Sequence, residues 1–159
     1  MIHLGIDPGK KGGIAGLDDN GELYHCSPYT PMALKQAIVN LHINDFSPAL
    51  KQSHISIEKA QAFPGQGVSG MFNYGKGCGI IEGIVIAFAV PYELVNPRVW
   101  QKVMFAGTDS KLKSKARAWQ ACQRIFPNYY HSFMTARGNV HDGMVDAALI
   151  AEFGRRTSS

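Results

Sequence analysis

Two short alternating segments constrain the fold of this chain more than any other feature, and each of them ends in a carboxylate. In residues 2–7, "IHLGID", an apolar residue occupies every second position and the last residue is Asp7. Residues 54–58, "HISIE", repeat the alternation and end at Glu58. A period of two is typical of strands with one buried face. The sequence therefore predicts two strands that each carry an acid at the carboxyl end.

The segments around these two strands predict further strands and a first helix. "GGIAGLD" and "GELYHC" are typical of two short strands joined at the turn "DDNG", so the chain is expected to open with a three-strand meander. Thr30 and Pro31 offer an N-cap and a first-turn proline for a helix over about residues 31–42. The glycine-rich stretch "FPGQGVSG" is expected to be a loop that leads to an apolar helix near residues 75–89.

The second half of the chain is expected to be mainly helical. "PYELVN" predicts a short strand, "PRVWQKVMF" begins a helix, and "PNYYHSFMTARGN" predicts a loop before a final helix, "HDGMVDAALIAEFGRR". Residues 110–126 predict a basic amphipathic helix, whose expected inward residues are Leu112, Ala116, Trp119, Ala121 or Cys122, and Ile125 or Phe126. This order predicts an α/β fold, a mixed five-stranded sheet with helices on its faces, in a single domain over residues 1–159.

Composition limits the environment and the partners of the protein. The net charge is +4, and residues 98–137 hold eight Lys or Arg but only one acid, which favours contact with a polyanion. The three cysteines are widely spaced and include no CxxC pair, which favours a reducing intracellular, cytoplasmic setting over a disulfide framework or a zinc site. The most apolar stretch, residues 79–90, is too short to span a bilayer and contains Glu82, so no membrane partner is expected.

Four acids are expected to meet at one place. If the first and fourth strands are neighbours, Asp7 and Glu58 emerge side by side at the edge where α/β sheets place their active crevice. Asp142 and Asp146 are four residues apart and share one face of the last helix. Clustered carboxylates repel one another unless divalent cations neutralise them. Oxygen ligands suit Mg²⁺, and a pair of such ions can promote phosphodiester hydrolysis.

Each acid also has an ordinary structural interpretation. Asp7 precedes Pro8 and Gly9 and fits a turn aspartate, and Glu58 fits a solvated strand end. Asp142 fits a first-turn acid that complements the helix dipole. Asp146 is harder to explain in this way, because "MVDAALIA" surrounds it with apolar residues. The hypothesis of an acidic site therefore depends on the joint placement of the four residues.

Four stretches in the same order resemble the RuvC-type Holliday junction resolvases, particularly their short phage-like forms. The stretches are "HLGIDPG", "ISIEKAQAFPGQGVSGMFNYGKGCGIIEGI", "PYELVNPRVWQK" and "HDGMVDAALIAEFGRR". The resemblance implies a ribonuclease H-like fold, a homodimer, dependence on Mg²⁺ with Mn²⁺ as a substitute, and paired nicks across a four-way DNA junction. It implies metal-binding and catalytic roles for Asp7, Glu58 and Asp146.

The fourth acid matches the family less cleanly. The family often places this ligand three residues before the last one, which is Gly143 here. Asp142 lies four residues before Asp146 and returns to the same helix face, so it is the predicted fourth catalytic and metal-binding residue. His141 is adjacent and is the alternative.

Basic and aromatic residues are the candidates for DNA contact. The resemblance strengthens Lys102 and the segment that contains Lys111, Lys113 and Lys115, although a solvated helix face explains such a run equally simply. Phe63, in the loop after Glu58, is predicted to stack on a base, with Phe72 and Tyr74 as rivals. The apolar residues of the helix near 75–89 suit either a dimer face or the core.

Two other functions remain open at the level of sequence. A junction-binding protein without catalysis would need the basic surface but not the full set of acids. An actin-like ATPase also carries an Asp with glycines in its first hairpin, but such proteins need two domains of this kind and the chain has 159 residues.

Overall fold

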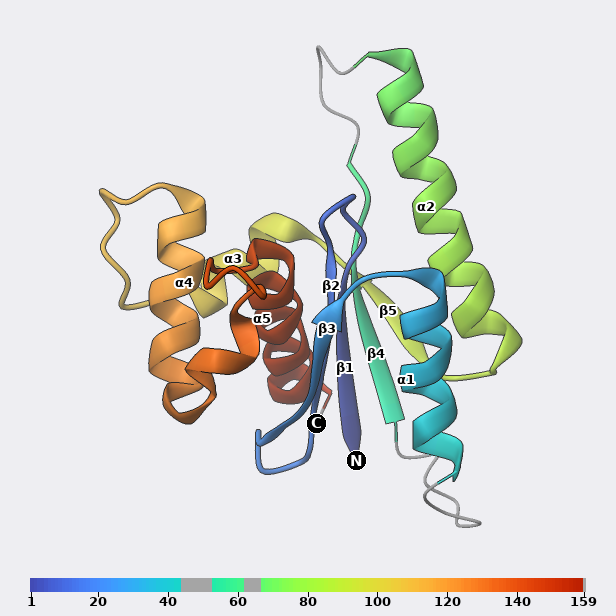
Figure 1. Ribbon diagram of the computed structural model, residues 1–159, viewed down its shortest axis with the longest axis horizontal. Coiled ribbons are helices and arrows are strands. Elements are labelled where there is room, and N and C mark those ends of the chain that lie inside the picture. The colour runs from blue at the N-terminus through green and yellow to red at the C-terminus, as the bar shows by residue number, and fades with distance from the viewer. Residues whose placement is uncertain (44–52, 62–66, 159) are drawn as a thin grey trace.

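The computed structural model describes residues 1–43, 53–61 and 67–158, and a five-stranded sheet lies between two helical layers (Figure 1). The strand order is β3-β2-β1-β4-β5. The strands are β1 (Ile2–Asp7), β2 (Gly13–Leu17), β3 (Leu23–Pro28), β4 (Ser53–Glu58) and β5 (Tyr92–Val95). The first three form an antiparallel meander, whereas β4 pairs parallel with both β1 and β5. The predicted mixed five-stranded sheet is therefore confirmed.

One face of the sheet is covered by the last helix. Figure 1 shows α5 (Asp142–Thr157) along this face, with α3 (Pro97–Met104) and α4 (Ser114–Ile125) on the same side. Buried side chains from these helices and from the sheet form one apolar cluster, which includes Ala15, Trp100 and Leu149. Burial of this cluster is the main stabilising contribution on this face.

Two helices cover the opposite face. Alternate residues of the central strands, such as Ile6, Ile55 and Ile57, pack there against α1 (Pro31–Ile43) and α2 (Val68–Ala87). Each of these three isoleucines is at most 1% exposed. The period-two pattern from which the strands were predicted thus corresponds to burial on this side, and helices cover both faces as expected.

Glycines allow α5 to lie directly on the backbone of the sheet. A Cβ atom added to Gly5 in β1 would stand 2.1 Å from the carbonyl oxygen of Ala147 in α5. A Cβ atom on Gly143 would stand 2.1 Å from the carbonyl oxygen of Lys11. No other residue type fits at such distances, so the glycines fix how closely the helix approaches. The first turn of α5 is consequently held against the turn that follows β1.

Two helices begin at different residues from those predicted. The helix expected near residues 75–89 is α2, which begins at Val68, where the amide of Met71 donates to the carbonyl of Gly67 at 3.0 Å. Glycine disfavours a helix by about 1 kcal/mol per residue but does not prohibit it, so the stretch expected to be a loop is partly helical. The helix expected from residue 110 begins at Ser114, because the Asp109 side chain accepts the Lys111 amide in a turn.

The later start of α4 changes which of its residues face inward. Leu112 lies before the helix and is 40% exposed, and Ala116 is also exposed. The predictions for Leu112 and Ala116 are therefore wrong. Those for Ala121, Cys122 and Phe126 are confirmed, and Ala118 is buried with them.

The predicted loop before α5 contains two ordered structures. Residues Pro127–Phe133 form a 3₁₀ helix, and a bridge between Met134 and Val140 then closes a short hairpin. None of the helices in the described parts of the chain combines the length and apolarity needed to cross a bilayer.

Candidate active site

Asp7 and Glu58 leave the sheet side by side. The parallel register pairs Ile6 of β1 with Ile57 of β4, so the next residue on each strand is one of the two acids. The first and fourth strands are therefore neighbours, which was the condition for the two acids to emerge side by side. Asp7 is held in place by the Gly9 amide, which donates to its Oδ1 at 3.0 Å, and Gly9 begins the tight return into β2.

Glu58 is held by a tryptophan from a distant part of the chain. Trp100 in α3 is fully buried, and its indole Nε1–H donates to Glu58 Oε2 at 2.8 Å. Nothing in the sequence predicted this hydrogen bond. The indole ring of tryptophan can only donate a hydrogen bond, through its single N–H. Because a carboxylate accepts this bond, the contact favours the charged form of Glu58 and fixes the orientation of its side chain.

Asp146 reaches the same place from the helix. It lies one turn into α5, between residues that are buried against the sheet, and its own side chain is half-buried. The pKa of Asp146 is raised to about 8, mainly by burial and in addition by the charges of Asp7, Glu58 and Asp142, while the charge of Lys115 opposes the rise. The electrostatic influence of three other acids on Asp146 indicates that β1, β4 and α5 bring their carboxylates into one region.

The two strand-end acids are perturbed in the same direction. The pKa of Glu58 is raised to about 7, mainly by burial; the hydrogen bond from Trp100 opposes the rise and the charge of Asp7 adds to it. Burial also raises the pKa of Asp7, against the hydrogen bond from Gly9 and the charge of His141. Three carboxyl groups with raised pKa values at one site make the fully ionised state unfavourable unless cations neutralise it.

The structure explains why position 143 carries no acid. The Cβ of any other residue there would collide with the backbone of the β1–β2 turn, as the Lys11 contact shows. The neighbouring residues take polar roles instead. Asp142 is about half-exposed and pairs with Lys115 of α4. His141 is the N-cap of α5, and its Nδ1 accepts the Met144 amide at 3.2 Å.

A cavity of about 680 Å³ opens over Asp7 and Asp146. Its lining includes basic residues from three separate elements, Lys11 after β1, Lys115 in α4 and Arg137 in the hairpin before α5. His141 and Asp142 also line it. Acids and cations that line one cavity are expected where a phosphate is bound through metal ions.

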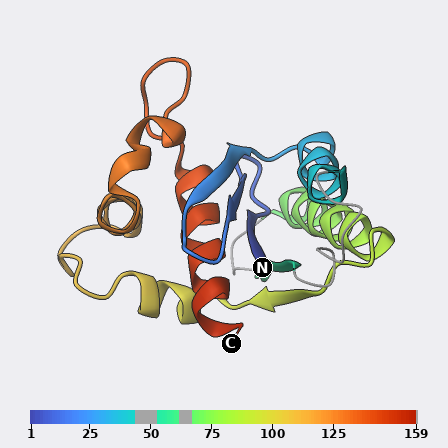
Figure 2. The same ribbon diagram turned by 90° about the horizontal axis from the view of Figure 1, so that it is seen from below.

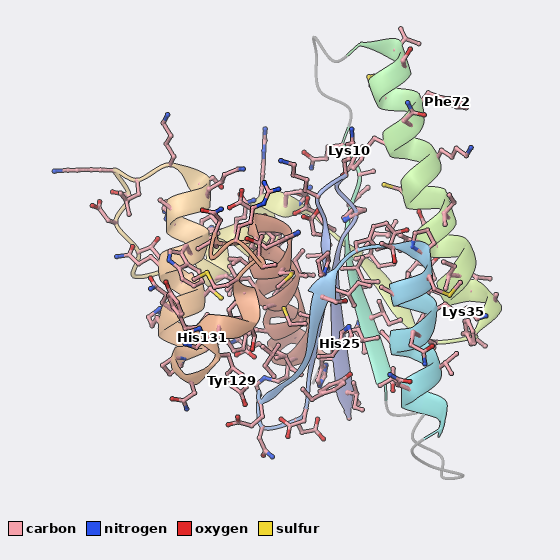
Figure 3. The ribbon with its side chains drawn as sticks, in the orientation of Figure 1. Lys10, His25, Lys35, Phe72, Tyr129 and His131 are labelled. Atoms are coloured by element: carbon pink, nitrogen blue, oxygen red, sulfur yellow. The ribbon has the colours of Figure 1, made fainter. Side chains whose placement is uncertain are left out.

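The other predicted DNA-binding residues do not line this cavity or lie outside the described residues. Lys102, Lys111 and Lys113 are exposed on or near α3 and α4 and do not line it. Phe63 lies outside the described residues. Of its two rivals, Phe72 is 69% exposed on the part of α2 that projects past the sheet (Figure 3), and Tyr74 is half-buried.

Arg137 was missed as a site residue. It lies in the stretch "TARGN" that was predicted only as a loop. The signal available was a basic residue before a turn glycine, a few residues ahead of the predicted acids of the last helix.

The donor chemistry of the site fits a hard divalent cation. Asp7, Glu58 and Asp146 offer only carboxylate oxygens, which Mg²⁺ prefers, and their raised pKa values reflect the negative charge that a cation would neutralise. Within the described part of the chain, no three His, Cys, Asp or Glu side chains already stand close enough to form a metal centre. The side chains of Asp7, Glu58 and Asp146 would therefore have to move closer together to coordinate one ion.

The sheet order, the helices on both faces and the acids at the strand ends define a ribonuclease H-like fold. Two solved structures share this fold along almost the whole chain. One is described as Thermus thermophilus RuvC in complex with a Holliday junction substrate, with a TM-score of 0.61, 14% identity, and coverage of 98% of this chain and 95% of that one. The other is a Thermus thermophilus RuvC structure with a TM-score of 0.57, 17% identity, and coverage of 99% and 97%.

The expected resemblance to RuvC is thus confirmed at the level of the fold. No protein-family model matches the sequence. No curated protein matches it either.

Proposed function

We propose that this protein is a structure-selective DNA endonuclease that resolves four-way junctions by metal-dependent phosphodiester hydrolysis. The observation that carries the proposal is the meeting of Asp7, Glu58 and Asp146 from β1, β4 and α5 in a fold shared with RuvC. The junction as substrate is supported by the RuvC structure that was solved with a Holliday junction.

Each residue of the site has a task in this proposal. Asp7, Glu58 and Asp146 hold Mg²⁺, or Mn²⁺ in its place, and Asp142 is the proposed fourth residue. Bound divalent cations supply an activated water and stabilise the leaving oxygen of a phosphodiester. Trp100 orients Glu58 through its indole N–H, and Gly9 orients Asp7. Lys115 balances the charge of Asp142 while the site is free of substrate.

The remaining lysines belong to a wider DNA surface in the proposal. Lys102, Lys111 and Lys113 are exposed on the side of the molecule that carries α3 and α4. Contacts of this kind bind phosphates without reading sequence, so affinity should fall as salt rises. Phe63 is still proposed to stack on a base at the junction.

The proposal includes a homodimer, for which exposed apolar residues on α2 are the support. Val68, Met71 and Phe72 are 83%, 39% and 69% exposed on the projecting end of this helix. Apolar side chains gathered in this way are typical of a surface that another molecule covers. Sedimentation equilibrium should give twice the 17.4 kDa mass of the chain, and a monomer at micromolar concentration would contradict the dimer.

The test is a nicking assay on a four-way junction with mobile and fixed cores, in Mg²⁺. The wild type should nick two strands of like polarity. Asp7→Asn should reduce nicking by about a hundred- to a thousandfold, because it removes one charge from the metal-binding acids and such a loss is typical of a single electrostatic group in an active site. Junction affinity in EDTA should change little.

The control for this assay is Asp109→Asn, which removes one acid from the turn before α4. It should nick as the wild type does. Binding of the junction without nicking by the wild type would favour a non-catalytic binding protein, and ATP turnover without nicking would favour an ATPase. Near-normal nicking by Asp7→Asn would refute the assignment of the site.

A further inference from the structure

The hairpin of residues 134–140 is an ordered element with its own hydrogen bonds. The Thr135 amide donates to the carbonyl of Asn139 at 2.8 Å, and the Gly138 amide donates to the carbonyl of Thr135 at 2.9 Å. Gly138 has a φ of 75°, in the left-handed region that glycine adopts without strain. Figure 2 shows this orange segment projecting from the body of the molecule beside α5. The position of its tip is therefore fixed before any ligand arrives.

The base of the hairpin is tied to the candidate active site. Phe133, which is 1% exposed, anchors its first strand in the core. The His141 amide donates to the Phe133 carbonyl at 2.8 Å, and His141 then caps α5 one residue before Asp142. The hairpin and the acidic end of α5 consequently form one connected unit.

Arg137 is the cation at the tip of this hairpin. It is exposed and lines the same cavity as Asp7 and Asp146. Lys115, another cation of that lining, is already paired with Asp142. Among residues 1–43, 53–61 and 67–158, no group forms an ion pair or a side-chain hydrogen bond with Arg137. Its five N–H donors are therefore available to a ligand.

The chemistry of the cavity identifies that ligand as a phosphate. Asp7 and Asp146 repel anions unless cations bind there, so the acidic wall would hold one phosphate only through metal ions. Arg137 lines the cavity from a different element and needs no metal to bind an anion. The planar guanidinium suits bidentate contact with phosphate oxygens, which an ammonium group does not offer.

We propose that Arg137 binds a backbone phosphate adjacent to the one held over the acids, and that the hairpin thereby fixes the register of the DNA strand in the cavity. This inference rests on the proposed function, because it takes a nucleic acid strand as the ligand. Arg137 is a binding residue in this role, and its effect on hydrolysis follows from where it holds the strand. A strand that can slip by one nucleotide would be cut at more than one bond.

The test measures binding of junctions in EDTA, so that it does not depend on cleavage. Each junction carries one uncharged methylphosphonate linkage, and the linkage is moved stepwise along the strand on both sides of the centre. Arg137→Ala should bind the unmodified junction about tenfold more weakly than the wild type, as expected for loss of one charge-assisted contact. The slope of log affinity against log salt should fall by about 1.

The scan identifies the phosphate that Arg137 contacts. The wild type should lose about tenfold in affinity at one linkage, and Arg137→Ala should be insensitive at that same linkage while keeping the wild-type response elsewhere. Arg137→Lys keeps the charge without the bidentate geometry and should recover part of the loss. The matched control is Lys35→Ala, which removes a cation from α1 on the opposite side of the sheet (Figure 3) and should behave as the wild type.

The outcomes separate this inference from the endonuclease itself. Wild-type affinity in Arg137→Ala, or an unchanged response at every linkage, would overturn the role of Arg137 while leaving the endonuclease intact. Alternatively, the wild type is sensitive to one linkage to which Arg137→Ala is insensitive, yet never nicks the junction in Mg²⁺. That result would refute the endonuclease and support the inference. With nicking intact, Arg137→Ala should also spread its cuts over neighbouring bonds, and a single unchanged cut site would contradict the register.

Discussion

Helices α5 and α2 both contain several glycines, yet the glycines have opposite surroundings. In α5, Gly143 and Gly154 lie against the β1–β2 turn and against Ser56, where an added Cβ would stand 2.1 and 2.2 Å from the nearest atoms. In α2, an added Cβ on Gly75, Gly79 or Gly83 would meet nothing within 4 Å. Glycine therefore permits close packing against the sheet in α5, whereas the glycines of α2 face open space.

The close packing of α5 explains how the candidate active site is assembled. Because α5 lies on the sheet backbone, Asp146 comes within electrostatic reach of Asp7 and Glu58. A thicker side chain on the contact line of α5 would push the helix away and separate the acids. Helix α2 brings none of the three acids to the site, and its glycines have no neighbours that would exclude a side chain.

The largest expected effect is that of Gly143→Ala. Its Cβ would collide with the backbone of the β1–β2 turn, and backbone cannot move aside as a flexible side chain does. Overpacking of this kind costs up to about 3 kcal/mol, well above the roughly 1 kcal/mol that alanine adds to helix stability. Urea unfolding should therefore show a large decrease in the free energy of unfolding, and nicking should fall with it.

Gly79→Ala is the matched change in α2. With no neighbour to displace, it should raise the free energy of unfolding by up to about 1 kcal/mol through helix propensity alone. Equal destabilisation by the two changes would break the comparison. A stable Gly143→Ala variant with normal nicking would contradict the claim that close packing positions Asp146.

A moderate effect is expected for Trp100→Phe, which tests the support of Glu58 on the α5 side. The change removes the indole donor, so the pKa of Glu58 should rise above its value of about 7 and less of the carboxylate should be ionised at neutral pH. Nicking measured as kcat/KM should fall about fivefold at pH 7, because a rise of about one unit from a pKa of about 7 lowers the ionised fraction of Glu58 from roughly one half to roughly one tenth. It should recover as the pH rises.

The pH profile distinguishes this role from simple loss of packing. A phenylalanine leaves space in the core, which would lower activity by the same factor at every pH. The wild-type pH dependence, merely scaled down, would therefore mean that Trp100 only fills the core. The pKa of Glu58 is expected to rise and not to fall, because removing a hydrogen-bond donor from a carboxylate favours its protonated state.

The local pattern was enough to predict the sheet and the positions of the strand-end acids. Alternation in residues 2–7 and 54–58 predicted both strands and their buried faces. The position of the two acids also required β1 and β4 to be neighbours, a condition that their parallel pairing meets. Asp146 could be singled out because an acid among apolar residues of a helix is unusual. Its proximity to Asp7 depends on glycine contacts between distant segments, which no local pattern reveals.

The features that sequence did not reveal all depend on distant contacts or on weak local preferences. Trp100 lies 42 residues from Glu58, so nothing near either residue predicts their hydrogen bond. The start of α2 at Val68 was missed because glycines at 67 and 70 are typical of a loop, although propagation from an existing helix tolerates them. The hairpin that holds Arg137 is fixed by backbone bonds that leave only a turn signal in the sequence.

The central claim is that Asp7, Glu58 and Asp146 form one acidic site that cations stabilise, and it can be tested without any activity. Ionised Asp146 is unfavourable in the folded protein, because its pKa is about 8 there and 3.8 in the reference state. A raised pKa means that folded wild type loses stability as the pH rises between these values. Asp146→Asn cannot ionise and should lack this loss.

The most direct measurement is the melting temperature of wild type and Asp146→Asn in EDTA and in Mg²⁺, from pH 5 to pH 8. In EDTA the variant should be the more stable, by about 2 to 4 °C for each kcal/mol of repulsion removed, and the gap should widen with pH. Mg²⁺ should raise the melting temperature of the wild type and leave the variant nearly unchanged. Equal melting temperatures at pH 8, with no response of either protein to Mg²⁺, would contradict the account.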